Sequence, residues 1–230
     1  MEYYVSMKLK EWATILKADN KFVWYMPNFI PTHEAFTSWD TMELPGERSH
    51  RVICVSNLRS QKDHITLLKA WKQVAGQIPH SHLLLVGGIS EKEYAENVLS
   101  MLTEPALIGR VTWMGERSDV PALLKECQIG VLSSSSEGFP VTLLEYGFAE
   151  LGVVATNVGQ CAEILNQGEA GLLVNPGDSS ALANALVDLL TDESKRKRLG
   201  NRLFKHVSNH FSQKNVLLRL CSIYSELMSK

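Results

Sequence analysis

Between residues 51 and 190, short apolar runs alternate with longer amphipathic segments. Six runs rich in aliphatic and β-branched residues are typical of buried strands, and they span 51–55, 82–86, 110–114, 129–132, 152–155 and 171–174. The segments between and after them have helical periodicity: 63–76, 91–102, 119–127, 141–149, 161–166 and 178–190. Asp119 and Asp178 are expected to cap the helices that begin there. Such alternation predicts an α/β fold with a doubly wound parallel sheet of Rossmann-like type. Ligands of such sheets bind at the carboxyl ends of the strands.

The two ends of the chain have different patterns. Residues 8–17 are predicted to be helical and residues 22–26 to form a strand that ends at Pro27, whereas 32–50 are polar and irregular. After Asp192 the pattern is helical throughout, first in a basic amphipathic segment (194–210) and then in a last helix (212–228). We therefore divide the chain into residues 1–30, a linker over 31–50, the α/β domain over 51–210 and a final helix over 211–230.

The segment after the fourth strand of the domain carries candidate chemistry. Four serines precede Glu137, and Pro140 suits the first turn of the helix that follows. A helix N-terminus offers free N–H groups and a positive dipole end, which suit a phosphate. Glu137 would lie at the sheet edge and Glu145 about a turn and a half into the helix. Carboxylates there suit the hydroxyls of a sugar and a ribose, although two solvated glutamates are the plain alternative.

Composition narrows the class of protein. The chain has 230 residues, of which 45% are hydrophobic and 21% charged, with a net charge of -2, so it reads as a globular domain with no general attraction for nucleic acid or an anionic membrane. No apolar run could span a bilayer, and the chain start lacks the features of a signal peptide. The four cysteines are scattered, which favours reduced thiols. We expect a cytoplasmic protein.

Other motifs give weaker signals. His206 and His210 have the spacing of two metal ligands on one helix face, but no third ligand is near them in the sequence, so we expect a surface pair and no metal. The basic run 195–198 reads as a solvated face, although such a face could also contact anionic lipid. No Gly-x-Gly-x-x-Gly follows the first strand of the domain, which argues against a dinucleotide dehydrogenase.

Taken together, these motifs resemble the retaining glycosyltransferases of family four, which have the two-domain GT-B fold. The segment from Glu137 to Glu145 resembles the family's carboxylate signature, and residues 55–63 resemble its phosphate loop. Residues 110–115 resemble the strand and glycine, here Gly115, near the base pocket. Residues 152–164 and 171–178 resemble the strands and turns that follow the signature. The order and spacing agree over roughly residues 20–190.

The resemblance implies roles for individual residues. In the family, the C-terminal domain holds a nucleotide-sugar donor. Glu137 matches the glutamate that faces the donor sugar, Lys62 the lysine on the diphosphate, and Glu145 the glutamate that bonds the ribose. Glu137 and Lys62 are therefore our candidate catalytic residues. The start of the helix would bind the donor through the loop and first-turn positions Gly138, Phe139, Pro140 and Val141.

The sequence departs from the family pattern in two places. The family usually carries an arginine five residues before the lysine, where this chain has Asn57, and Arg59 follows two positions later. We count both Asn57 and Arg59 as candidates for donor binding, with Arg59 supplying the charge from a shifted position. Gln160 stands where a second glycine is common, which puts backbone access at that turn in doubt.

The resemblance also implies a function. A hexose would pass from an NDP-sugar to a glycan or lipid-linked acceptor with retention, in polysaccharide biosynthesis, with no cofactor and no metal. Residues 1–30 would be a remnant of the acceptor-binding N-terminal domain, and 211–230 the helix that crosses back onto it. With that domain missing, the isolated chain could be inactive. The main alternative is a non-catalytic module that binds a nucleotide-sugar. A GT-B-type epimerase is a weaker one, because the carboxylate signature favours a transferase.

Overall fold

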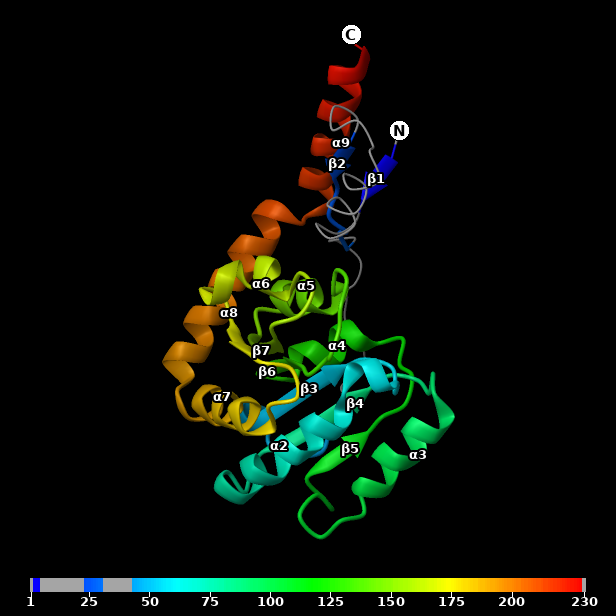
Figure 1. Cartoon of the computed structure of the whole chain (residues 1–230). Helices are drawn as coiled ribbons and strands as arrows, with labels where there is room; N and C mark the ends of the chain where they lie inside the picture. The colour runs from blue at the N-terminus through cyan, green and yellow to red at the C-terminus, as the bar shows by residue number, and fades with distance from the viewer. Residues whose placement is uncertain (1, 5–22, 31–42, 229–230) are drawn as a thin grey trace.

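The structure is a computed structural model that describes residues 2–4, 23–30 and 43–228. The helix predicted over 8–17 and most of the linker predicted over 31–50 lie outside the described residues. Strands β1 (Glu2–Tyr4) and β2 (Val23–Tyr25) form a small parallel pair. Figure 1 shows this pair beside helix α9 (Gln213–Met228), at the top of the larger α/β body.

The body is built on one parallel sheet of six strands, as the apolar runs predict. The strand order is β5-β4-β3-β6-β7-β8, and every neighbouring pair is parallel. This order is that of a Rossmann-like sheet, in which the chain starts in the middle and builds outward in both directions. The strands are β3 (Arg51–Val55), β4 (His82–Val86), β5 (Val111–Trp113), β6 (Ile129–Leu132), β7 (Gly152–Thr156) and β8 (Leu172–Val174).

Helices cover both faces of the sheet, so two hydrophobic cores form (Figure 1). The first core contains Trp71 and lies under α2 (His64–Gln77), α3 (Lys92–Met101) and α7 (Ser179–Thr191). The second contains Tyr146 and lies under α4 (Val120–Lys125), α5 (Val141–Phe148), α6 (Cys161–Ile164) and part of α8 (Glu193–His210). Short 3-10 turns are η2 (Arg48–His50), η3 (Ser60–Lys62) and η4 (Asn166–Gly168).

Helix capping follows the sequence prediction at Asp178 but not at Asp119. Asp178 accepts a hydrogen bond from the backbone N–H of Ala181 at 2.8 Å and so begins α7. Asp119 stands at the start of α4, but its carboxylate accepts two bonds from the Arg117 guanidinium, at 2.7 and 2.6 Å. The expected cap bond is therefore absent, because a bidentate charged donor is stronger than a backbone N–H.

Helix bounds also differ from prediction in two places. Pro140 precedes α5 as its cap residue with an extended backbone, rather than lying in the first turn. The helix predicted over 161–166 ends at Ile164 and gives way to η4, in which Gln167 has a left-handed backbone (φ 54°).

The basic run at 195–198 is mostly engaged within the protein. Lys195 pairs with Asp188 at 2.6 Å and Lys197 with Glu193 at 2.7 Å. Arg196 is buried and donates to the carbonyl of Leu189 at 2.9 Å. Three of the four cations therefore have partners, which weakens the case for a lipid-binding face. Within the described ranges, no helix is long and apolar enough to cross a membrane.

Candidate functional site

The candidate site lies where the strand order of the sheet reverses. Strands β3 and β6 are neighbours, and the chain leaves them toward opposite edges of the sheet. The loops that follow such a pair diverge and leave a crevice at their carboxyl ends. Lys62 follows β3 in η3, and Glu137 follows β6. The topology therefore brings together the two residues that we predicted to be catalytic.

Hydrogen bonds hold these two loops to each other. The Ser133 hydroxyl donates to the carbonyl of Lys62 at 2.9 Å, and the Ser135 amide donates to the carbonyl of Gln61, also at 2.9 Å. In return, the Gln61 side chain donates to the carbonyl of Ser136 at 2.7 Å. Ser133 and Ser135 thus act as donors, and Ser136 as an acceptor, in bonds that fix the loop of Glu137 against the loop of Lys62.

Lys62 and Glu137 form an ion pair. The Nζ of Lys62 lies 2.5 Å from Oε1 of Glu137, and the two side chains are only 14% and 7% exposed. The Ser134 hydroxyl donates to the same carboxylate oxygen at 2.6 Å. In the ligand-free protein, therefore, the cation expected at a diphosphate and the carboxylate expected at a sugar satisfy each other.

Glu145 is anchored by its neighbour Tyr146, which sequence reasoning missed. The ring of Tyr146 is fully buried, and its hydroxyl accepts from the amide of Val55 at 2.8 Å and faces the carbonyl of Val131 at 3.3 Å. It thereby joins α5 to both strands of the reversal point. Gly130 makes room for it, since a Cβ there would come within 2.4 Å of the ring. A glycine inside an aliphatic strand was the available signal.

The Glu145 side chain is half-buried and has no hydrogen bond or ion pair with any residue that the structure describes. Burial raises the pKa of its carboxyl group above the usual value. A carboxylate in the middle of α5 with no protein partner among the described residues is suited to accept bonds from the hydroxyl groups of a ligand.

The backbone at the start of α5 offers free donors. No described residue accepts a bond from the amides of Gly138, Phe139, Val141 or Thr142. The Phe139 ring packs edge-on against Phe211, with centroids 5.6 Å apart. The ring therefore anchors the loop, and its amide is the part left for a ligand. Free amides at a helix N-terminus form an anion-binding arrangement.

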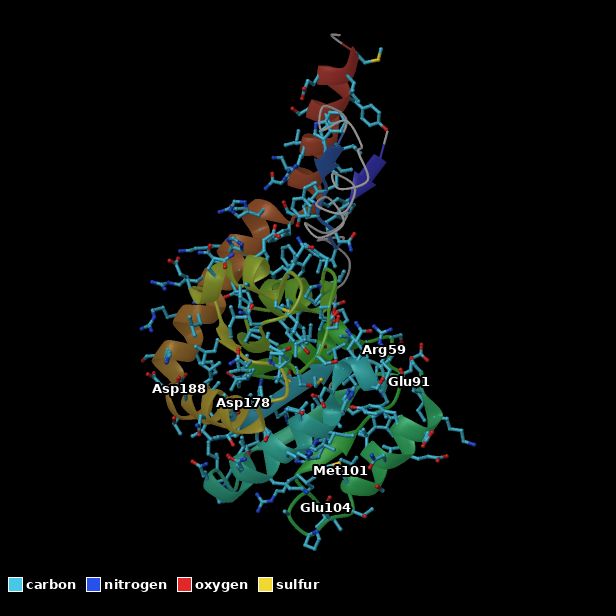
Figure 2. The ribbon with its side chains drawn as sticks, viewed as in Figure 1. Arg59, Glu91, Met101, Glu104, Asp178 and Asp188 are labelled. Carbon is cyan, nitrogen blue, oxygen red and sulfur yellow. The ribbon has the colours of Figure 1, made fainter. Side chains whose placement is uncertain are left out.

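Asn57 and Arg59 occupy different environments. The Asn57 side chain accepts from the amide of Gly88 at 2.9 Å, so it joins the ends of β3 and β4. Arg59 lies beside Glu91 at the same sheet edge (Figure 2), and its buried Nε has no partner among the described residues. The bond to Gly88 uses only the side-chain oxygen of Asn57, so the N–H groups of the Asn57 side chain, like the Nε of Arg59, have no hydrogen-bond partner among the described residues. The predicted role of either residue in donor binding stays a prediction.

Gly115 ends β5 at the same edge of the sheet. It has a left-handed backbone (φ 68°), and its carbonyl accepts from the amide of Gly87 at 2.8 Å. No atom lies within 4 Å of where its Cβ would be, so the space above it is open. Gly115 lies two strands away from β3, and its expected role near a base pocket stays a prediction.

His206 and His210 are neighbours on α8, with ring centroids 4.7 Å apart and ring planes tilted by 47°. The Nε2 of His206 donates a hydrogen bond to the backbone carbonyl of Glu163 at 3.0 Å. Among the described residues, no three side chains of His, Cys, Asp or Glu gather as metal ligands. Three of the four cysteines are buried, and each is a free thiol.

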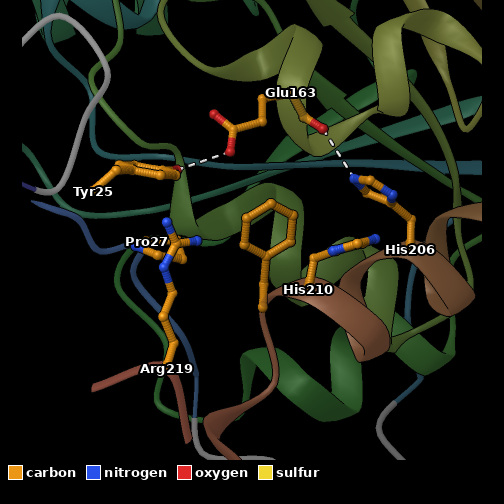
Figure 3. Close-up of a pocket in the computed structure, with 7 residues that line it drawn as sticks. Tyr25, Pro27, Glu163, His206, His210 and Arg219 are labelled. Carbon is orange, nitrogen blue, oxygen red and sulfur yellow. Dashed lines mark hydrogen bonds between the residues drawn. The ribbon is translucent and has the colours of Figure 1, made fainter. Parts of the chain in front are cut away.

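Two cavities lined by described residues lie away from Lys62 and Glu137. One, of about 240 Å³, lies between β2, α6, α8 and α9 and is lined by Tyr25, Glu163 and Arg219 among others (Figure 3). The other, of about 270 Å³, lies near Glu47 and Arg110 at the amino ends of the strands.

Comparisons with known proteins agree with this picture. Residues 49–192 match the family model described as Glycosyl transferases group 1. The chain is 26% identical over 214 residues to N-acetyl-alpha-D-glucosaminyl L-malate synthase of Bacillus anthracis, covering 91% of this chain and 55% of that protein. It is 25% identical over 202 residues to the lipopolysaccharide core biosynthesis mannosyltransferase LpcC of Rhizobium leguminosarum bv. viciae, a match that covers 87% of this chain and 57% of that protein. The chain thus spans little more than half of these relatives.

Solved structures show the same fold. Anabaena Alr3699/HepE in complex with UDP superposes with a TM-score of 0.85 at 21% identity, covering 97% of this chain and 63% of that one. The C-terminal domain of a glycosyl transferase group 1 family protein, LpcC of Francisella tularensis, superposes with a TM-score of 0.69 at 21% identity. The match covers 80% of this chain and 96% of that one. The matched fold, strand order and family model together mean that this chain belongs to the glycosyl transferases group 1 family and has the Rossmann-like architecture of a GT-B glycosyltransferase domain.

Proposed function

We propose that this chain binds an NDP-sugar and forms the donor-binding half of a retaining hexosyltransferase that builds a polysaccharide or glycoconjugate. One observation carries the proposal: at the reversal point of the sheet, Lys62 and Glu137 lie in contact beside a helix start with free amides. A cation and free N–H groups suit a diphosphate, and a carboxylate beside them suits a sugar hydroxyl.

The proposed chemistry requires charge to be relieved on the departing diphosphate. Lys62 and the amides at the start of α5 would stabilise that charge as it develops. Arg59 immediately precedes the 3-10 turn that contains Lys62, and it would add a second cation. Glu137 would orient the sugar and stabilise positive charge at the anomeric carbon, and Glu145 would accept bonds from the ribose.

The comparisons support the donor and the class of product. Anabaena Alr3699/HepE was solved with UDP and with UDP-glucose, and several relatives are named for polysaccharide or lipopolysaccharide synthesis. Because the chain spans only 55% and 57% of the two relatives described above, we propose that an acceptor-binding domain outside this sequence supplies the other half. Residues 1–30 and α9 would then pack against that domain, and transfer would occur in the cleft between the two halves.

The first test is donor binding by the 230-residue chain. Calorimetric titrations with UDP, GDP and ADP, each also as its glucose conjugate, should give one nucleotide with measurable affinity. Lys62→Ala should abolish most of it, while Lys92→Ala, which removes an exposed cation on α3, should not. Failure of every nucleoside diphosphate to bind would refute the proposal.

The second test concerns catalysis and stereochemistry. The chain joined to its acceptor-binding domain should release UDP from UDP-hexose in the presence of acceptor, and proton NMR of the product should show the anomeric configuration of the donor. Inverted product would refute retention. Tight donor binding with no transfer by the joined protein would instead favour the non-catalytic module.

A further inference from the structure

The turn that follows β7 supports the loop that carries Glu137. We call residues 133–140 the donor loop. The Thr156 hydroxyl donates to the carbonyl of Ser134 at 2.6 Å, and the backbone amide of Gln160 donates to the carbonyl of Gly138 at 3.0 Å. Gly159 lies against the same peptide, because a Cβ there would come within 2.1 Å of the carbonyl oxygen of Glu137. The position of this turn therefore determines the position of the donor loop.

The side chain of Gln160 connects the same turn to β2. Its Nε2 donates to the Tyr25 hydroxyl at 2.8 Å and to Oε2 of Glu163 at 2.6 Å. The Tyr25 hydroxyl in turn donates to Oε1 of Glu163 at 3.0 Å, which closes a three-membered ring of bonds (Figure 3 shows the Tyr25–Glu163 side). The amide orientation of Gln160 follows from this geometry, since its oxygen would repel the carboxylate.

The ring of bonds is shielded from water. Tyr25 and Gln160 are only 8% and 6% exposed. The Arg219 guanidinium of α9 lies over the Tyr25 ring, 5.4 Å from its centroid. Burial, with the Glu163 carboxylate beside it, raises the pKa of the Tyr25 hydroxyl, so this group stays a donor at neutral pH. Tyr25 is thus held by α6, α9 and Gln160 together, although it lies 135 positions before Gln160.

We propose that Gln160 is a positioning residue that couples the placement of β2, through Tyr25, to the donor loop and hence to Glu137. The inference rests on the proposed function for its consequence, which is that movement of β2 alters donor binding. Gln160 makes both connections itself, one with its side chain and one with its backbone amide, so no intermediate residue is needed. A glycine at this position would keep the bond to Gly138 and lose the bond to Tyr25.

Amide hydrogen exchange of the ligand-free chain tests the coupling directly. The amide of residue 160 reports its own bond to Gly138. Tyr25→Phe keeps the ring under Arg219 and removes only the hydroxyl. Amide exchange at residue 160 and in the donor loop should become about two- to tenfold faster, the range for loss of the neutral hydrogen bond between Gln160 and Tyr25. Tyr224→Phe makes the same chemical change on an exposed residue of α9 and should change nothing there.

The Gln160→Gly background separates coupling from general loosening. If Tyr25 acts through the side chain of Gln160, then Tyr25→Phe should have no further effect on residue 160 or the donor loop once that side chain is gone. Equal acceleration by Tyr25→Phe in both backgrounds, or none in either, would overturn the proposal. Amides of β3 and β4 serve as an internal reference, because a global loss of stability would speed them as well.

Nucleotide affinity distinguishes this inference from the proposed function. Tyr25→Phe should weaken UDP binding by about two- to tenfold in the native background and not in Gln160→Gly. If the native chain binds no nucleoside diphosphate while the exchange result holds, then the proposed function fails and the coupling stands. If UDP binds but neither its affinity nor exchange responds to Tyr25→Phe, the coupling fails and the proposed function stands.

Discussion

Removing the charge of Glu137 should tighten the binding of UDP to the isolated chain. The expectation is unusual for a residue assigned to the donor site, and it follows from the ion pair with Lys62 at 2.5 Å. Under the proposed function, Lys62 must leave Glu137 in order to reach the diphosphate. UDP carries no sugar whose hydroxyls could then satisfy the Glu137 carboxylate. Glu137→Gln removes the competing anion and also removes its repulsion of the diphosphate.

The magnitude follows from the burial of the pair. Because the two side chains are only 14% and 7% exposed, solvent screens their interaction little. A hydrogen bond between charged partners contributes about 1.5–3 kcal/mol. The glutamine carbonyl would still accept a bond from Lys62, so we expect about half of that energy, roughly 0.8–1.5 kcal/mol, to be released. This corresponds to a Kd for UDP that is about four- to twelvefold lower.

Calorimetry with UDP on the native chain, Glu137→Gln and Glu93→Gln would measure this. Glu93 is exposed on α3, so its substitution controls for the change in net charge. UDP-hexose should show a smaller gain or a loss, since the sugar would miss the carboxylate. An unchanged or weaker affinity for UDP in Glu137→Gln, with the control also unchanged, would show that Lys62 does not have to leave Glu137 when the diphosphate binds.

Four further predictions concern single residues. Glu145→Ala should weaken UDP and UMP alike by about ten- to a hundredfold, as loss of bonds from a carboxylate to the ribose requires, and equal calorimetric affinities would refute the assignment. Lys62→Ala should weaken UDP more than UMP; an equal loss would move Lys62 away from the diphosphate. His64 is fully buried, and burial lowers its pKa from 6.5 to about 4. Between pH 6.5 and about 4 the unfolded chain therefore protonates this histidine while the folded chain does not. The free energy of unfolding should fall as the pH is lowered through this range, by up to about 1.4 kcal/mol per pH unit. Urea unfolding should show a weaker pH dependence of the free energy of unfolding in His64→Asn. The pH dependence should be unchanged in His80→Asn, because His80 is exposed. Gly130→Ala should cost roughly 1–3 kcal/mol by overpacking the Tyr146 ring, whereas Gly76→Ala, in α2 with open space around it, should be neutral or stabilising by the same assay.

The sequence by itself determined the elements of the α/β body. The run 51–55 becomes a buried strand because Val52, Ile53 and Val55 are apolar and β-branched, which is a local property. The same is true of the cap at Asp178, where a side chain and an amide three residues away meet in any helix start. The sequence also indicated the positions of Lys62, Glu137 and Glu145 at strand ends and a helix start.

The tertiary structure decided which of these residues touch. Lys62 and Glu137 are 75 positions apart, and they meet because β3 and β6 are neighbours in the sheet, which no local periodicity encodes. The same holds for Tyr25 and Gln160. Asp119 shows that a prediction from local sequence can also be wrong. Its local pattern predicted a cap, but a charged partner two residues away took the carboxylate. Local sequence sets what an element is, whereas hydrogen bonds and ion pairs form with the strongest partner that the packing brings within reach.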